Sequence, residues 1–265
     1  MTRVLRNLLL AVLLAVSVVA LPSHGGEVRV AAAADLKYAF DEIMLAFRAE
    51  RPDVAVRVTY GSSGNFYAQL RSRAPFDVFL SADLLYPRRL ADDGLALGSE
   101  VFAYAVGRIV LWVPGSSPLE VDRLGIRALL DPSVRRIAIA NPRHAPYGVA
   151  AEAALRSLGV YDAVAGRLVL GENVAQTAQF VQSRAADAGI IALSLVVAPP
   201  MRGQGRYWEI PLEAYPTMEQ GGMITPWARD AAAARALRDY MLGPAGRAIL
   251  ERYGFVLPWT GKPSG

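Results

Sequence analysis

Four short turns rich in small residues are the part of this sequence best suited to chemistry, because each follows a strand-like run and opens a helix-like one. They are Ala33-Ala34-Asp35, Gly61-Ser62-Ser63-Gly64, Ala145-Pro146-Tyr147-Gly148 and Glu172-Asn173-Val174. The first N–H groups of a helix have no partner within it, and the helix dipole adds roughly half a positive charge there. Four such ends around one cleft can replace the hydration shell of an oxyanion without any Lys or Arg. Any single turn is equally an ordinary helix cap, so the prediction rests on the set.

The runs around these turns predict an α/β fold. We expect strands over 27–32, 54–60, 77–80, 101–106, 109–113, 137–140, 168–170, 189–193 and 207–210, and helices from Leu36, then over 65–73, 84–93, 149–158, 174–184, 231–241 and 243–253. Strands that alternate with helices are typical of a mostly parallel sheet, and ligands bind beyond the carboxyl ends of such strands.

The pattern restarts after Gly107, which predicts two lobes with a ligand cleft between them. We assign 1–26 to a signal peptide, 27–106 and 218–265 to the first lobe, and 107–217 to the second. Arg3 and Arg6 precede an apolar run over 8–21 that is too short for a confident membrane span, so we expect export to the periplasm; retention as an anchored form is the alternative.

Composition excludes several classes of function. The 265-residue chain has no cysteine, so a disulfide, a thiolate nucleophile and a thiolate metal site are all excluded. Its net charge is +4, but the Arg residues are scattered among 24 acidic residues, which argues against a nucleic-acid partner. No long apolar seam demands a second subunit, so we expect a monomer.

The same turns contain residues that suggest two other kinds of site, a hydrolase site and a metal-cation site. Ser63 is a conceivable hydrolase nucleophile, but its surroundings do not match G-x-S-x-G, and His24 and His144 have no evident orienting acid. We expect His144 to be a solvated surface residue, and Ser62 or Ser63 to cap its helix if neither binds ligand. A hard cation site is a further alternative, built from Asp35, Asp77, Asp83, Tyr60, Tyr67 and Tyr147.

Several motifs, in this order along the chain, resemble the periplasmic molybdate-binding proteins of ABC importers. They are AAAADL at 31–36, GSSG at 61–64, PFDVFLSAD at 75–83, GRIVLW at 107–112, IAIANP at 137–142, APYG at 145–148 and RYGFVLP at 252–258. The resemblance spans about 28–258. It implies a type II periplasmic binding protein fold, molybdate or tungstate as the transported ligand, an ABC permease as partner, and neither enzymatic activity nor a cofactor.

The resemblance also implies which residues bind the anion. The first binding turn falls on Ala34 and Asp35, the serine contact on Ser63, and the remaining contacts on the backbone of Tyr147 and the N–H of Val174. Two positions depart from the family. Some members have a hydroxyl or amide side chain where this chain has Asp35, and some have a tyrosine where it has Ala192.

Asp35 is the sharper departure, because a carboxylate about 4 Å from one negative charge costs roughly 4 kcal/mol at an effective dielectric of 20. Three explanations are open: Asp35 caps its own helix through the N–H of Lys37 or Tyr38, it is protonated and donates a hydrogen bond, or the ligand is not a tetrahedral dianion. We favour capping, with Lys37 offsetting the charge. The expected function is therefore capture of molybdate or tungstate, with another small solute or a cation as the alternative and a secreted hydrolase as the remote one.

Overall fold

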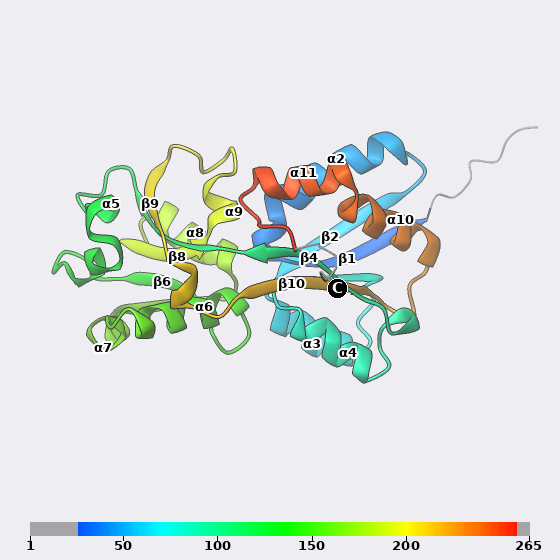
Figure 1. Cartoon of the computed structure of the whole chain (residues 1–265), viewed down its shortest axis with the longest axis horizontal. Coiled ribbons are helices and arrows are strands. Elements are labelled where there is room, and N and C mark those ends of the chain that lie inside the picture. Colours follow the sequence, from blue (N-terminus) through cyan, green and yellow to red (C-terminus); the bar gives the residue numbers. More distant parts are fainter. Residues whose placement is uncertain (1–25, 259–265) are drawn as a thin grey trace, which may run out of the picture.

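The computed structural model describes residues 26–258, whose strands form two five-stranded sheets (Figure 1). In each sheet four strands share one direction, while β10 in the first and β5 in the second run antiparallel to both neighbours. The predicted architecture of two mostly parallel sheets flanked by helices is confirmed. The predicted signal peptide lies outside the described residues except for Gly26.

The first sheet has the strand order β2-β1-β3-β10-β4, and the second β7-β6-β8-β5-β9. The strands of the first sheet are β1 (Glu27–Ala33), β2 (Ala55–Gly61), β3 (Val78–Ser81), β4 (Val101–Gly107) and β10 (Met218–Ile224). Those of the second are β5 (Ile109–Pro114), β6 (Ile137–Ala140), β7 (Leu168–Gly171), β8 (Ala188–Ala192) and β9 (Gly205–Glu209). In both sheets the antiparallel strand lies next to an edge strand: it is β10, the last strand of the first sheet, and β5, the first strand of the second.

Helices cover both faces of the first sheet. On one face lie α2 (Lys37–Glu50), α10 (Ala231–Leu242) and α11 (Pro244–Arg252), and on the other α3 (Ser63–Arg71) and α4 (Leu85–Asp92) (Figure 1). The buried residues of α2 include Phe40, Ile43 and Phe47, as its helical spacing predicts. Because both faces are covered, β1 from Val30 onward and β3 up to Leu80 can be wholly apolar.

The second sheet carries shorter helices and several 3₁₀ turns. The helices are α5 (Val121–Leu124), α6 (Pro146–Ser157), α7 (Tyr161–Val164), α8 (Val174–Gln182) and α9 (Leu193–Val196). The 3₁₀ turns of the whole described chain are η1 (Ala34–Leu36), η2 (Leu97–Ser99), η3 (Gly125–Leu130), η4 (Ala165–Arg167) and η5 (Leu212–Ala214). No helix within residues 26–258 is both long and apolar enough to cross a membrane.

The chain passes between the sheets twice. It leaves the first sheet at Gly107, enters the second at Ile109, and returns through the segment between Glu209 and Met218 (Figure 1). After α11 the chain comes back to β4, where Val256 pairs with Val106. We retain 27–106 with 218–265, and 107–217, as the proposed lobe limits.

Several elements begin earlier than the sequence pattern predicts. Helix α3 begins at Ser63 rather than 65, and α6 at Pro146 rather than 149, where a proline at the first helical position costs no hydrogen bond. The sequence pattern gives no strand over 218–224, where the structure has β10 with Gly221 and Gly222 in its interior. A Cβ at either glycine would come within 2.7 Å of a neighbouring backbone oxygen, so the glycines allow close packing inside the sheet.

Candidate functional site

All four turns open onto one small cavity between the lobes. Its lining residues are Ala33, Ala34, Asp35, Gly61, Ser62, Ser63, Ala82, Ala145, Pro146, Tyr147, Asn173 and Val174, so the five residues predicted to bind the anion lie together. None of the lining residues is Lys or Arg. About 10 Å³ is open to the centre of a water-sized sphere, which is close to what one water molecule needs. The open space where the four turns meet is therefore small in this structure.

The start of α3 offers two donors to this cavity. Within residues 26–258 the Ser63 N–H has no acceptor, and the Ser63 Oγ accepts a hydrogen bond from the Ala82 N–H at 2.9 Å. Because the hydroxyl already accepts there, its own proton is available for an anion. Neither serine caps α3 with its side chain, so the capping alternative is wrong.

The start of α8 leaves a single N–H free. The Asn173 side chain accepts from the N–H groups of Ala175 and Gln176, both at 3.0 Å. The N–H of Val174, at the first helical position, has no acceptor in the described part of the chain. The Asn173 side chain thus satisfies the next two N–H groups of α8, and the Val174 N–H remains available to an anion in the cavity.

The start of α6 also leaves a single N–H free, but there a proline and a backbone carbonyl account for the other positions. Pro146 has no N–H, and the N–H groups of Gly148 and Val149 both donate to the Ala145 carbonyl. For Tyr147 the structure of residues 26–258 provides no acceptor, so its N–H is the remaining donor. Three N–H groups and one hydroxyl, drawn from both lobes, are therefore available to an anion in the cavity.

The Asp35 side chain faces the protein interior and does not cap its helix, so our preferred explanation for this residue is wrong. Its Oδ2 accepts from the Tyr147 hydroxyl at 3.0 Å and from the Gln220 amide at 2.8 Å. Oδ1 has no hydrogen-bond partner among residues 26–258. Lys37 does not offset the charge either, because its Nζ pairs with Asp41 at 3.1 Å.

The surroundings of Asp35 favour its neutral form. The residue is 1% exposed, and burial raises the pKa of its carboxyl to about 6. Hydrogen bonds from Gln220 and Tyr147, and the N–H groups of Asp35 and Leu36, lower this pKa by less than burial raises it. Burial, and then the charge on Asp35, raise the pKa values of Tyr147 and Tyr104, so both phenols stay neutral.

Ala192, the second departure from the family, does not reach the cavity. It ends β8, is fully buried, and is not among the lining residues. The hydroxyl of Tyr147 is engaged with Asp35. No tyrosine hydroxyl is therefore offered to the cavity, either from position 192 or from Tyr147.

His144 is a contact between the lobes and not the solvated residue that the sequence predicts. Its carbonyl accepts from the Gly64 N–H at 2.8 Å, and its Nδ1 lies 3.0 Å from the Ser62 Oγ. Its Nε2 lies 3.6 Å from a carboxylate oxygen of Glu172. His144 therefore does have an acidic neighbour, but the imidazole faces Ser62, whereas the Oγ of the predicted nucleophile, Ser63, faces Ala82.

The residues of the alternative cation site are engaged elsewhere. Asp77 accepts from the N–H groups of Arg29 and Arg229, and Asp83 accepts from the Leu85 N–H, as its position before a helix predicts. Tyr60 donates to Asp41 at 2.6 Å. Within residues 26–258 no three His, Asp or Glu side chains are grouped to hold a metal ion. The structure thus disfavours a cation site.

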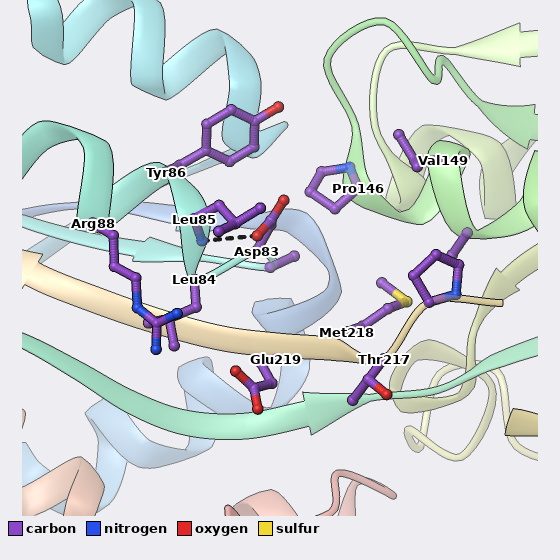
Figure 2. Close-up of a pocket in the computed structure, with 13 residues that line it drawn as sticks. Asp83, Leu84, Leu85, Tyr86, Arg88, Pro146, Val149, Thr217, Met218 and Glu219 are labelled. Atoms are coloured by element: carbon purple, nitrogen blue, oxygen red, sulfur yellow. Dashed lines mark hydrogen bonds between the residues drawn. The ribbon is translucent and has the colours of Figure 1, made fainter. Parts of the chain in front are cut away.

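A larger groove lies beside the cavity and shares Ala82 and Pro146 with it. Figure 2 shows Leu85 and Tyr86 of α4 on one side and Pro146 and Val149 of α6 on the other. The volume of this groove is about 330 Å³, and its lining is mostly apolar. Its charged residues are Asp83, Glu219 and Arg88. Two carboxylates against one guanidinium make this groove the poorer anion site.

The sequence analysis missed three parts of the site: Gln220, Ala82 and the capping role of Asn173. Gln220 is fully buried on β10, next to a shift in the β10–β4 pairing. Apart from Glu219, this amide is the only polar side chain of β10, which was a signal because a buried polar group needs a partner. The Ala82 N–H gave no signal, since its role depends only on where the chain brings it.

Comparisons with known proteins identify the family and support the fold. A family model described as bacterial extracellular solute-binding protein matches residues 28–256. Molybdate-binding protein ModA of Rhodobacter capsulatus is 36% identical over 89% of this chain and 91% of its own length, and the Azotobacter vinelandii ModA is 35% identical over 94% and 97%. The solved structure of an Azotobacter vinelandii periplasmic molybdate-binding protein superposes with a TM-score of 0.82 at 34% identity, covering 88% of this chain and all of that one.

Proposed function

This chain belongs to the bacterial extracellular solute-binding protein family, and from that premise we propose that it captures molybdate or tungstate and delivers the anion to an ABC importer. The similarity to molybdate-binding proteins over most of both chains supports this ligand class. The proposed ligand is transported unchanged, so the site needs neither a nucleophile nor a cofactor.

One observation carries the proposal: the free N–H groups of Ser63, Tyr147 and Val174 and the Ser63 hydroxyl meet at a cavity without a cationic side chain. Hydrogen bonds from such donors to an anion are charge-assisted, each contributing roughly 1.5 to 3 kcal/mol. The turn at Ala34 and Asp35 completes the proposed binding set. We attribute selectivity to the spacing of these fixed donors in the closed, loaded form: sulfate carries the same charge as molybdate and tungstate but is smaller, so it would not reach all of the donors at once.

Closure of the lobes accounts for capture and delivery in this proposal. Ser63 belongs to the first lobe, and Tyr147 and Val174 to the second, so the full donor set exists only when the lobes meet. The closed surface is then the form that a membrane permease recognises. We further propose that the protein acts in the periplasm as a monomer.

Isothermal titration of the purified protein with molybdate, tungstate, sulfate and phosphate at neutral pH tests this function. We expect stoichiometric binding of molybdate or tungstate and no binding of sulfate. Ser63→Ala should weaken binding by about 10- to 150-fold, as the loss of one charge-assisted hydrogen bond predicts. Ser157→Ala, at the exposed end of α6, is the matched control and should bind normally. Absence of binding for all four anions would contradict the proposal.

A further inference from the structure

Asp35 lines the cavity that we assign to a dianion, and its buried carboxyl group faces the protein interior beside that cavity. The neighbours of Asp35 carry no charge that compensates for it: Tyr147 on α6, Tyr104 on β4 and Gln220 on β10 are neutral, and Ser194 on α9 donates to the Asp35 carbonyl at 2.8 Å. The only charged pair on the adjoining turn of α2 is Lys37 with Asp41, and these two are bonded to each other. An ionised Asp35 would thus add a third negative charge to the filled site.

Asp35 and Gln220 each have one oxygen without a partner. The Gln220 Nε2 donates to the Asp35 Oδ2 at 2.8 Å and lies 3.2 Å from the Tyr147 hydroxyl. Within residues 26–258, the Asp35 Oδ1 and the Gln220 Oε1 are both buried and have no hydrogen bond. Two unpaired acceptors on one bonded pair are costly. A single proton on Oδ1 removes the charge, and a buried unpaired charge costs more than a buried unpaired neutral group.

We propose that this protein binds its oxyanion together with one proton, which Asp35 holds on Oδ1. The inference rests on the proposed function, since it requires an anion in the cavity. The proton comes from solvent, and no other bond forms or breaks. The site then holds two negative charges instead of three.

Lobe closure is what couples the two ligands. Tyr147 and Ser194 belong to the second lobe, so opening the lobes separates them from Asp35 and returns the carboxyl to water. A hydrated Asp is ionised at neutral pH. Closure over a dianion removes that water and places the carboxyl beside two negative charges, and both effects favour its protonated form.

The coupling predicts a pH dependence with a fixed slope. When one proton is taken up for each anion bound, affinity falls tenfold for each pH unit. We expect about a hundredfold loss in molybdate affinity between pH 6.5 and 8.5. Molybdate itself stays fully deprotonated across this range, so the slope reports on the protein.

Isothermal titration with molybdate in HEPES and in Tris at pH 7.5 counts the protons directly, because the two buffers differ in ionisation enthalpy. We expect the wild type to take up about one proton per anion. Asp35→Asn, which keeps the shape and replaces Oδ1 or Oδ2 by a permanent donor, should take up none and bind independently of pH. Asp83→Asn is the matched control: Asp83 accepts from the Leu85 N–H in the neighbouring groove, so this variant should behave as the wild type.

The outcomes separate the inference from the function on which it rests. Wild-type binding without proton uptake, or an unchanged pH slope in Asp35→Asn, overturns the proton inference and leaves the oxyanion function standing. Failure of molybdate and tungstate to bind the wild type at any pH from 5 to 8.5 overturns both. If Asp35→Asn does not fold, the number of protons taken up by the wild type and by Asp83→Asn still tests the inference: about one proton per anion in both supports it, and none overturns it.

Discussion

The two lobes approach the same cavity with different chemistry. The second lobe offers the N–H groups of Tyr147 and Val174, and the other first-turn donors beside them are already satisfied by Ala145 and Asn173. The first lobe offers the N–H and hydroxyl of Ser63, but it also brings Asp35, a buried carboxyl with one oxygen unpaired. The second lobe is a neutral, pre-arranged half-site, whereas the first combines donors with a group that titrates.

This difference separates what sets affinity from what sets its pH dependence. Neutral N–H groups and a hydroxyl cannot change charge near neutral pH, so we expect the second lobe and Ser63 to bind alike at any pH in this range. Asp35 alone among the lining residues can respond to pH. Substitutions in one lobe at a time can therefore separate the residues that set affinity from the residue that sets its pH dependence.

The largest expected effect comes from preventing the two half-sites from meeting. A Cβ on Gly64 would lie 2.6 Å from the His144 carbonyl oxygen and 2.9 Å from its Cα, which are backbone atoms of the other lobe. Gly64→Ala should therefore keep the lobes apart and weaken molybdate binding by at least a hundredfold, as measured by titration calorimetry.

Loss of binding in Gly64→Ala should not come from unfolding, because alanine favours a helix over glycine. Gly166→Ala is the matched control: a Cβ there meets no atom within 4 Å, so this variant should bind and melt like the wild type. Tight binding by Gly64→Ala would show that the donors do not need this closure.

The next effect concerns the titrating half-site without any ligand. In the closed fold the Asp35 pKa rises from 3.8 to about 6, so the folded state holds this proton more tightly than the unfolded chain. The stability that the neutral carboxyl contributes is complete below about pH 3.8 and is lost as pH rises through about 6. A shift of about two units corresponds to a loss of up to about 3 kcal/mol.

Urea denaturation of the wild type and Asp35→Asn between pH 4 and pH 7.5 measures this loss. The wild type should weaken relative to the asparagine variant as pH rises, because an amide cannot ionise. The closed arrangement of the structure carries this prediction, and parallel pH profiles for the two proteins would show that without ligand the lobes are open and Asp35 is hydrated.

The smallest effect concerns the pre-arranged half-site. Asn173→Ala removes the cap of α8 and should lower the free energy of unfolding by about 1 kcal/mol, which is a fall in Tm of about 2–4 °C for a protein of this size. Asn173→Asp keeps an acceptor for the Ala175 and Gln176 N–H groups, so it should keep the Tm. Because Asn173 also lines the cavity, the added charge should still weaken anion binding. A fall in Tm for both variants alike would argue against the cap.

Much of the fold could be predicted because the spacing of apolar residues, which distinguishes helices from strands, can be read within a short stretch of sequence. The buried spacing in α2, the apolar strands β1 and β6, and the restart of the pattern after Gly107 are all visible in the sequence. Strand β10 was not predicted, because two of its central residues, Gly221 and Gly222, have no side chain to contribute to a hydrophobic pattern. Only the neighbours Leu84, Phe79 and Phe102 explain why those positions have no side chain.

The site divides in the same way between local and long-range information. The sequence by itself determined that four helix ends follow strands and that their first residues are small, and the N–H groups left free at Ser63, Tyr147 and Val174 follow from local helix geometry. The tertiary structure alone decided the side-chain partners: Asp35 with Gln220, 185 positions away, His144 with Gly64, and Ser63 with Ala82. The physical reason is that a free N–H is set by the turn that contains it, whereas the charge state of a buried carboxyl is set by whatever distant groups exclude water from it.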